Sequence, residues 1–116
     1  MSDGQKKFQA VIWDFGGVIT SSPFEAFNRY ETANGLPENF IRLINSTNPD
    51  DNAWALFERS EIDAAAFDTA FLQEAEARGH SVRGADVLAL LAGDVRPDMV
   101  AVVDRLKADG YRIACI

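Results

Sequence analysis

The chain has 116 residues, 47% of them hydrophobic and 25% charged, a composition typical of one ordinary soluble domain and unlike that of a disordered or fibrous protein. The formal net charge of -7 opposes binding to a phosphate backbone, so nucleic acid is not an expected partner. A single cysteine excludes an intrachain disulfide and favours a reducing, cytoplasmic location. One histidine excludes a histidine-based metal cluster.

The first apolar run, residues 8–13, is followed directly by Asp14. It is too short for a signal-peptide core or a membrane span, so no membrane association is expected. The run is rich in strand-favouring residues and predicts a buried strand that ends near Asp14. Because both faces of this strand are apolar, it is expected in the centre of a parallel sheet.

Residues 22–92 carry helix signals and no convincing strand pattern. Ser22-Pro23-Phe24-Glu25 combines a capping residue, a proline at the first helical position and a glutamate, which predicts a helix to about Ala33. Four more helices are predicted: after Pro37, after an Asn48 cap, after an Asp63 cap, and over residues 87–91.

A helix is predicted to begin at Arg96-Pro97-Asp98 and to end at Gly110, before a second apolar strand over residues 111–116. A strand, a long helical insertion, a helix and a strand predict an enlarged parallel crossover, and therefore the α/β class. The predicted organisation is a core segment 1–21, a helical insertion 22–92 and a core segment 93–116.

Several chemically interesting side chains are given structural roles. Cys115 is expected in the core of the second strand, and His80, which follows Gly79, in a solvent-exposed linker. Lys107 is expected in water at the carbonyl end of a helix. Glu58 and Glu61 are expected on a solvated helix face.

Asp14 is the candidate functional residue, because ligands of open α/β sheets collect at the carboxyl ends of the strands. Phe15-Gly16-Gly17 allows the backbone to turn sharply and to direct N–H groups at an anion. A carboxylate beside such an anion site calls for a cation between them, and Mg²⁺ takes oxygen ligands of this kind.

Two other interpretations of Asp14 stay open. Its side chain can simply cap a turn that the glycines make tight. Asp14-Phe15-Gly16 also matches the letters of the metal-binding motif of protein kinases, but only thirteen residues precede it, too few for the kinase elements that lie upstream of that motif.

Val11-Ile12-Trp13-Asp14-Phe15-Gly16-Gly17-Val18-Ile19-Thr20 resembles the first motif of the haloacid dehalogenase-like hydrolase superfamily. Residues 57–62 and 96–99 are similar to the branch that contains the N-terminal phosphatase domain of soluble epoxide hydrolases. The resemblance implies a Rossmannoid parallel sheet, present here in part, with an inserted α-helical cap. It also implies that substrate enters between cap and core.

The resemblance further implies a Mg²⁺-dependent phosphatase that acts through an aspartyl-phosphate on Asp14. In that arrangement the Asp14 carboxylate and the Gly16 backbone carbonyl hold Mg²⁺, and the N–H groups of Phe15 and Gly16 bind the phosphate. The implied substrate is a small phosphorylated metabolite, whose identity the sequence does not indicate.

The chain departs from the family pattern at Gly16, where the phosphatases carry a second Asp that acts as general acid and base. Its absence predicts slow turnover, a substitute group or a good leaving group. The dehalogenase branch lacks this Asp too, so a 2-haloacid dehalogenase is one alternative. A non-catalytic binding or scaffold protein is the other.

The family's later motifs are a Ser or Thr after the second strand, a Lys and an acidic pair, and none of them lies before Ile116. Residues 1–116 alone are therefore expected to show no appreciable phosphatase activity. Two strands leave apolar faces and an unpaired edge uncovered, which favours contact with another molecule, including a second copy in a homo-oligomer.

Overall fold

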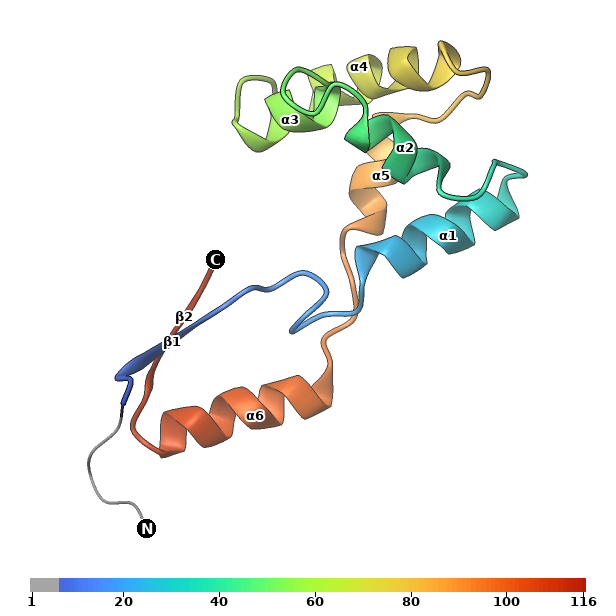
Figure 1. The fold of residues 1–116 in the computed structure, drawn as a ribbon. Helices are drawn as coiled ribbons and strands as arrows, with labels where there is room; N and C mark the ends of the chain where they lie inside the picture. The colour runs from blue at the N-terminus through green and yellow to red at the C-terminus, as the bar shows by residue number, and fades with distance from the viewer. Residues whose placement is uncertain (1–6) are drawn as a thin grey trace. The chain divides into compact units, whose positions relative to one another are not determined.

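The structure is a computed structural model, and it describes residues 7–116. In this part of the chain there are six helices and one two-stranded parallel sheet, so the fold is mixed α/β (Figure 1). The elements in order are β1 (Ala10–Trp13), α1 (Pro23–Ala33), α2 (Phe40–Ser46), α3 (Ala53–Glu58), α4 (Ala64–Glu76), α5 (Gly84–Leu90), α6 (Pro97–Ala108) and β2 (Arg112–Cys115).

These elements form two compact units. The helical unit is Pro23–Ala92 and contains α1 to α5. The sheet unit consists of the described residues up to Ser22 together with Gly93–Ile116. No helix within residues 7–116 combines the length and the apolar character that a membrane crossing requires.

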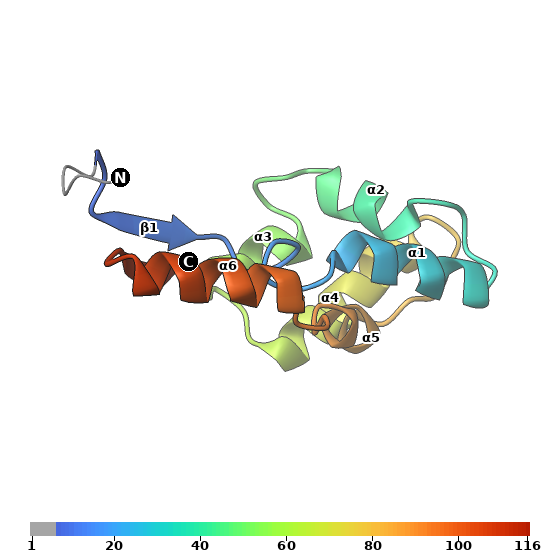
Figure 2. The same cartoon turned by 90° about the horizontal axis from the view of Figure 1, so that it is seen from below.

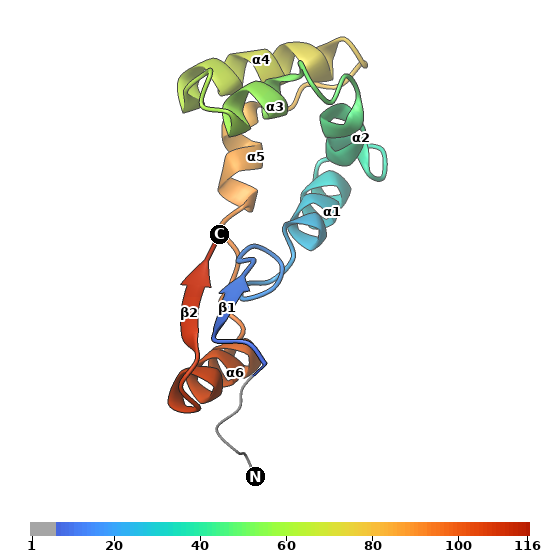
Figure 3. The ribbon, with the colours of Figure 1, turned by 60° about the vertical axis from the view of Figure 1, so that its left-hand side comes forward.

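In the sheet unit, β1 and β2 lie side by side and parallel, in a register that pairs Ala10 with Arg112 and Trp13 with Cys115 (Figure 3). Helix α6 runs along β1 (Figure 2) and leads into β2 (Figure 3). Pro97 starts this helix, and Gly110, with a φ of 93°, follows its end. The predicted parallel crossover is therefore present.

The expectation that these strands are buried is wrong for the described residues. Side chains along β1 alternate between exposed and half-buried, and Ile12 is 64% exposed. Cys115, predicted in the core, is exposed. Both errors have one cause: burial of a parallel strand needs neighbours on both edges and both faces, and two strands with one helix do not supply them.

The helical unit has a well-formed core, centred on one side of α4. Phe67, Phe71 and Ala75 lie one helical turn apart and are fully buried. The Phe67 ring contacts three other aromatic rings, those of Phe71, Trp54 and Phe57, with centroid distances of 5.6, 6.0 and 5.1 Å. The helical insertion therefore has a hydrophobic core of its own.

Helix α4 begins where the sequence predicts, because the Asp63 side chain accepts a hydrogen bond from the Ala66 N–H at 2.8 Å. Helix α3 does not: its cap is Asn52, and the predicted cap Asn48 lies in the preceding turn with a φ of 51°. Asn52 Oδ1 accepts from the Ala55 N–H at 2.8 Å.

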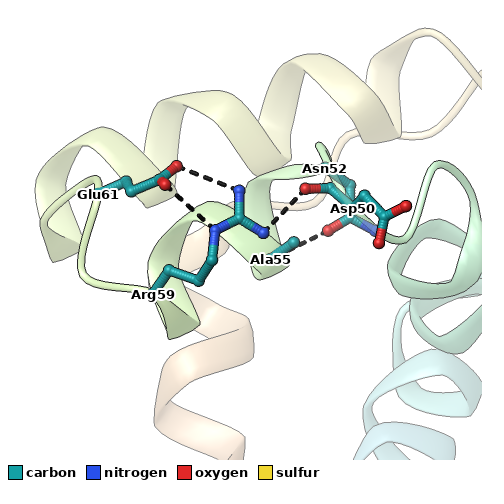
Figure 4. A network of polar contacts seen from close by, with 5 residues as sticks. All are labelled: Asp50, Asn52, Ala55, Arg59 and Glu61. Atoms are coloured by element: carbon teal, nitrogen blue, oxygen red, sulfur yellow. Dashed lines mark hydrogen bonds and ion pairs between the residues drawn. The ribbon is translucent and has the colours of Figure 1, made fainter.

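Helix α3 is clamped at both ends by polar contacts (Figure 4). At the end of the helix, Arg59 makes a bidentate ion pair with Glu61. Arg59 also donates, at 2.9 Å, to the carbonyl oxygen of Asp50, a residue that precedes the helix. At its start, the Asn52 amide donates to the carbonyl oxygens of Asn45 and Thr47 at 2.9 and 3.0 Å. These bonds fix α3 against the end of α2.

Helices α4 and α5 approach closely at Gly84, where a Cβ atom would lie 2.7 Å from the Phe67 carbonyl oxygen. Beside this contact, Asp68 accepts hydrogen bonds from the Arg83 guanidinium and from the Ala85 N–H. The Arg83 hydrogen bond, followed by that from Ala85, lowers the pKa of Asp68. Glycine at position 84 thus permits a contact that the Asp68 carboxylate holds in place.

His80 is not an exposed linker residue as predicted. It is half-buried, and its ring meets the Phe40 ring edge-on, with 5.1 Å between centroids. Gly79 does end α4, with a φ of 89°, and this turn brings His80 back against the helical unit.

Glu31 is a buried carboxylate, 1% exposed, in the middle of the helical unit. It joins α1 to the start of α2, because its two oxygens accept the N–H groups of Asn39 and Ile41 at 3.0 and 2.9 Å. N–H groups at the start of a helix have no intrahelical acceptors. Glu31, which belongs to another helix, supplies the acceptors here.

Glu31→Gln should destabilise the helical unit by about 1.5–3 kcal/mol, because one of the two N–H groups would then face an amide NH₂ instead of an acceptor oxygen. The control is Glu38→Gln, an exposed carboxylate of the same unit outside its helices, which should change stability by less than about 0.5 kcal/mol. Urea unfolding followed by far-UV circular dichroism measures both. Equal effects of the two substitutions would contradict the role given to Glu31.

Candidate functional site

Asp14 directly follows β1, at the end of the sheet where Trp13 pairs with Cys115. Its carboxylate is exposed. The prediction that Asp14 lies at the carboxyl end of a strand parallel to the second strand is therefore confirmed. In open α/β sheets this is the edge at which ligands bind.

A tight turn follows Asp14, built around the carbonyl oxygen of Phe15. This oxygen accepts the N–H groups of Val18, Ile19 and Thr20 at 3.2, 2.9 and 3.2 Å. Gly17 permits the turn, because its φ of 78° is disfavoured for residues with a side chain. The turn brings Ile19 and Thr20 into buried positions, 9% and 6% exposed, which anchor it in the sheet unit.

A second segment, far along the chain, holds this turn in place. The Ser21 N–H donates to the Asp94 carbonyl at 2.8 Å, the Asp94 N–H donates to Ser21 Oγ at 3.0 Å, and the Arg96 N–H donates to the Ile19 carbonyl at 2.8 Å. An antiparallel bridge joins Thr20 to Val95 as well. We call this contact between residues 19–21 and residues 93–96 the pinch.

Gly93 is required at the pinch. A Cβ atom at this position would lie 2.8 Å from Ser21 Oγ and 2.9 Å from the Ser21 carbonyl oxygen. Sequence reasoning missed this role, since it used Arg96 only as a helix start and did not single out Gly93. Arg96 in addition donates from its guanidinium to the Val18 carbonyl at 3.4 Å and pairs with Asp98 at 3.3 Å, so it is a cation fixed to the turn.

The Asp14 carboxylate makes one local hydrogen bond. Its Oδ1 accepts the Phe15 N–H at 2.8 Å, the kind of contact that the turn-capping interpretation predicts. No hydrogen bond to Oδ2 of Asp14, or from the N–H of Gly16, is found within residues 7–116. The carboxylate is thus oriented through one oxygen, and the other oxygen is available for a ligand or for chemistry.

The donors near Asp14 match Mg²⁺ in chemistry but are few. Carboxylate and carbonyl oxygens, such as those of Asp14 and Gly16, are the ligands that Mg²⁺ prefers. In the part of the chain that the structure describes, no three His, Cys, Asp or Glu side chains are grouped to hold a metal ion. The residues therefore fit a weakly held Mg²⁺ that takes most of its ligands from water and substrate.

The two neighbours of Asp14 in the chain help to line an apolar cavity of about 180 Å³. Trp13 and Phe15 contribute to its wall, together with Val100 and Val103 of α6 and Ile113 of β2. Phe15 is 46% exposed, so its ring does not close the cavity off. Asp14 does not line this cavity, which is an apolar surface between α6 and the strands.

Other charged residues weighed from the sequence lie away from this turn. Lys107 is exposed in the last turn of α6, as predicted. Glu58 and Glu61 are exposed in the helical unit, also as predicted, and Glu61 is paired with Arg59. The site that the structure assembles consists of Asp14, the turn after it and the pinch.

A scan of the chain against protein-family models finds no match, and a search of curated proteins finds none either.

Two glycine substitutions near Asp14 should differ in their effect on stability. Gly93→Ala should destabilise the sheet unit by about 1–3 kcal/mol, because the new methyl group overlaps the Ser21 backbone. Gly16→Ala should change stability by less than about 0.5 kcal/mol, since a Cβ atom there meets nothing within 4 Å. Hydrogen exchange at the Ser21, Asp94 and Arg96 amides provides the measurement. Faster exchange in the Gly16 variant and not in the Gly93 variant would refute this account of the pinch.

Proposed function

We propose that the chain belongs to a haloacid dehalogenase-like hydrolase and that Asp14 is the nucleophile of a phosphohydrolase. The observation that supports this most directly is the position of Asp14: an exposed carboxylate at the carboxyl end of a parallel strand, followed at once by a tight turn. The order of elements supports it as well, since the whole helical unit is inserted between β1 and the α6–β2 pair. We propose that this insertion is the family's α-helical cap.

In the proposed reaction, Asp14 Oδ2 attacks the phosphorus atom of a small phosphorylated substrate. An O–P bond forms as the bond from phosphorus to the leaving group breaks, and the leaving group departs with its bonding electrons. Water then attacks the aspartyl-phosphate, which releases inorganic phosphate and restores the carboxylate. The Phe15 N–H, held on Oδ1, orients the carboxylate so that Oδ2 faces outward.

Two backbone groups of the turn support this chemistry. The N–H of Gly16, which has no hydrogen bond within the described chain, can donate to an equatorial phosphoryl oxygen. Asp14 and the Gly16 carbonyl would hold Mg²⁺, which when bound neutralises phosphate charge. We place Phe15 in phosphate binding only through its N–H, which would have to exchange Asp14 Oδ1 for a phosphoryl oxygen.

Glycine at position 16 limits the substrates that this site can process. No side chain there can protonate the leaving group or deprotonate the attacking water, help that contributes roughly a hundred- to ten-thousand-fold in rate. Substrates whose leaving group is stable as an anion are therefore favoured. Hydrolysis of the intermediate, which needs a base, is expected to be slower than its formation.

The absence of an acid and base side chain at Gly16 also supports dehalogenation as a second candidate. Attack of Asp14 on the carbon of a 2-haloacid would expel halide, and a halide ion leaves without a proton. We rank this reaction second because the turn with its free N–H suits an anion such as phosphate.

Acetyl phosphate with Mg²⁺, used on the full-length protein, tests the nucleophile, because acetate leaves without protonation. The expected result is a phosphoryl adduct on Asp14, seen by intact-mass and peptide mass spectrometry, that Asp14→Asn abolishes. Asp94→Asn is the matched control, since only backbone atoms of Asp94 are used at the pinch, and it should keep the adduct. An adduct that survives Asp14→Asn would remove Asp14 as the nucleophile.

The rival functions are separated in the same experiment. Chloroacetate should give no ester on Asp14 and no chloride release if the site is a phosphohydrolase, whereas both would favour the dehalogenase. If neither reagent labels the protein, the non-catalytic alternative, a binding or scaffold protein, gains support and the proposed phosphohydrolase is rejected.

Gly16→Asp should raise the rate at which an aryl phosphate is hydrolysed by about a hundred- to ten-thousand-fold, because it adds the missing acid and base. A Cβ atom at position 16 meets no described atom within 4 Å. Gly16→Asn has nearly the same shape without the proton transfer, and its rate should remain at the level of the unaltered protein. Equal rates for the Asp and Asn variants would show that proton transfer at this position is not what the site lacks.

A further inference from the structure

A cavity of about 450 Å³ lies within the helical unit, where α1, α2, α3 and the end of α5 meet. Its volume lies in the range of small-molecule sites. Six of the residues that line it carry the argument: Phe24, Phe27, Arg42, Asn45, Trp54 and Glu58. All of them belong to Pro23–Ala92, so the cavity is a property of this unit alone.

One part of the lining is aromatic. Phe24 and Phe27 lie on the same side of α1, with their rings edge-to-face and 6.0 Å between centroids. Trp54 of α3 is held in the core by its contact with the Phe67 ring, 6.0 Å between centroids. These three side chains give the cavity a rigid apolar surface.

The other part of the lining carries two opposite charges. Arg42 lies over the Phe24 ring, with its guanidinium carbon 4.3 Å from the centroid. Neither Arg42 nor Glu58 makes an ion pair anywhere in residues 7–116, with each other or with any other group. A cation and an anion, both exposed, therefore line one open cavity without forming an ion pair.

A third polar group adds to this arrangement. The side chain of Asn45 lines the cavity, and its Oδ1 is buried with no hydrogen-bond donor. This oxygen has almost no accessible surface, so a ligand in the cavity contacts the exposed part of the Asn45 side chain and not Oδ1. Few such groups occur in folded proteins, and they call for an explanation.

The fold holds these side chains in position. Arg42 and Asn45 are three residues apart on α2, and Trp54 and Glu58 are four residues apart on α3, so each pair lies on one face of its helix. The clamp on α3 joins the two helices, because the Asn52 amide donates to the Asn45 carbonyl at 2.9 Å. The positions of the two charges are thus linked by the hydrogen bonds that fix α3.

We propose that this cavity binds a small zwitterion with an apolar side chain, that is, an amino acid or a close relative of one. Its carboxylate pairs with Arg42, its ammonium group pairs with Glu58, and its side chain packs against Phe27 and Trp54. A simple anion would meet the Glu58 charge, and a simple cation would meet that of Arg42. This proposal does not depend on the function proposed for Asp14.

Three probes of similar shape test it: L-phenylalanine, 3-phenylpropionate, which lacks the ammonium group, and 2-phenylethylamine, which lacks the carboxylate. Titration calorimetry on the whole chain measures their affinities. Phenylalanine should bind at least about tenfold more tightly than either single-charge probe, since each charged hydrogen bond is worth 1.5–3 kcal/mol. Equal affinity for all three probes, or no saturable binding of phenylalanine, would overturn the proposal.

Variants identify the partner of each charge. Arg42→Gln should weaken phenylalanine binding about tenfold and strengthen 2-phenylethylamine binding, because a like charge is removed. Glu58→Gln should likewise weaken phenylalanine binding about tenfold and strengthen 3-phenylpropionate binding. Arg29→Gln and Glu76→Gln are the controls, exposed charges of the same unit outside the cavity, and should change neither affinity. Circular dichroism confirms folding of each variant. Binding that all four variants weaken equally would indicate a general charge effect and refute the site.

Discussion

Parallel pairing of β1 with β2 is the constraint on which the rest of the structure depends. Two parallel strands cannot be joined by a short turn, so the chain must leave the sheet at one end and return to the other. Here the return is made by α6, and the whole helical unit is inserted before it. The pinch, where residues 19–21 meet 93–96, closes the sheet unit around this insertion. The turn that carries Asp14 is positioned by both contacts.

Local chemistry made much of the fold predictable. Pro23, Asp63 and Pro97 mark helix starts by mechanisms that act within one turn, and each of these helices begins where its signal lies. Asp14 at the end of a strand was predictable for the same reason. Asn52 was not, because its capping role depends on the Asn45 and Thr47 carbonyls as well as on its own helix.

What could not be predicted depends on residues far apart in the chain. The exposure of Ile12 and Cys115 reflects how many strands the sheet has, a property that no local pattern contains. The pinch joins Ser21 to Asp94, and neither residue belongs to a recognisable motif. The unpaired charges of Arg42 and Glu58 are likewise invisible in the sequence, where each is one exposed helix residue among many.

The pinch also affects how this architecture can change over time. Because it holds the two ends of the insertion together, the entropy of closing the segment between them rises only slowly with the length of that segment. A longer, shorter or different set of helices could be spliced in at this point without altering the strand register. Gly93 is the position at which such exchange is most constrained, because there the two ends touch backbone to backbone. The helical unit, with its own core, can therefore diversify by recombination while the strand that carries Asp14 is kept.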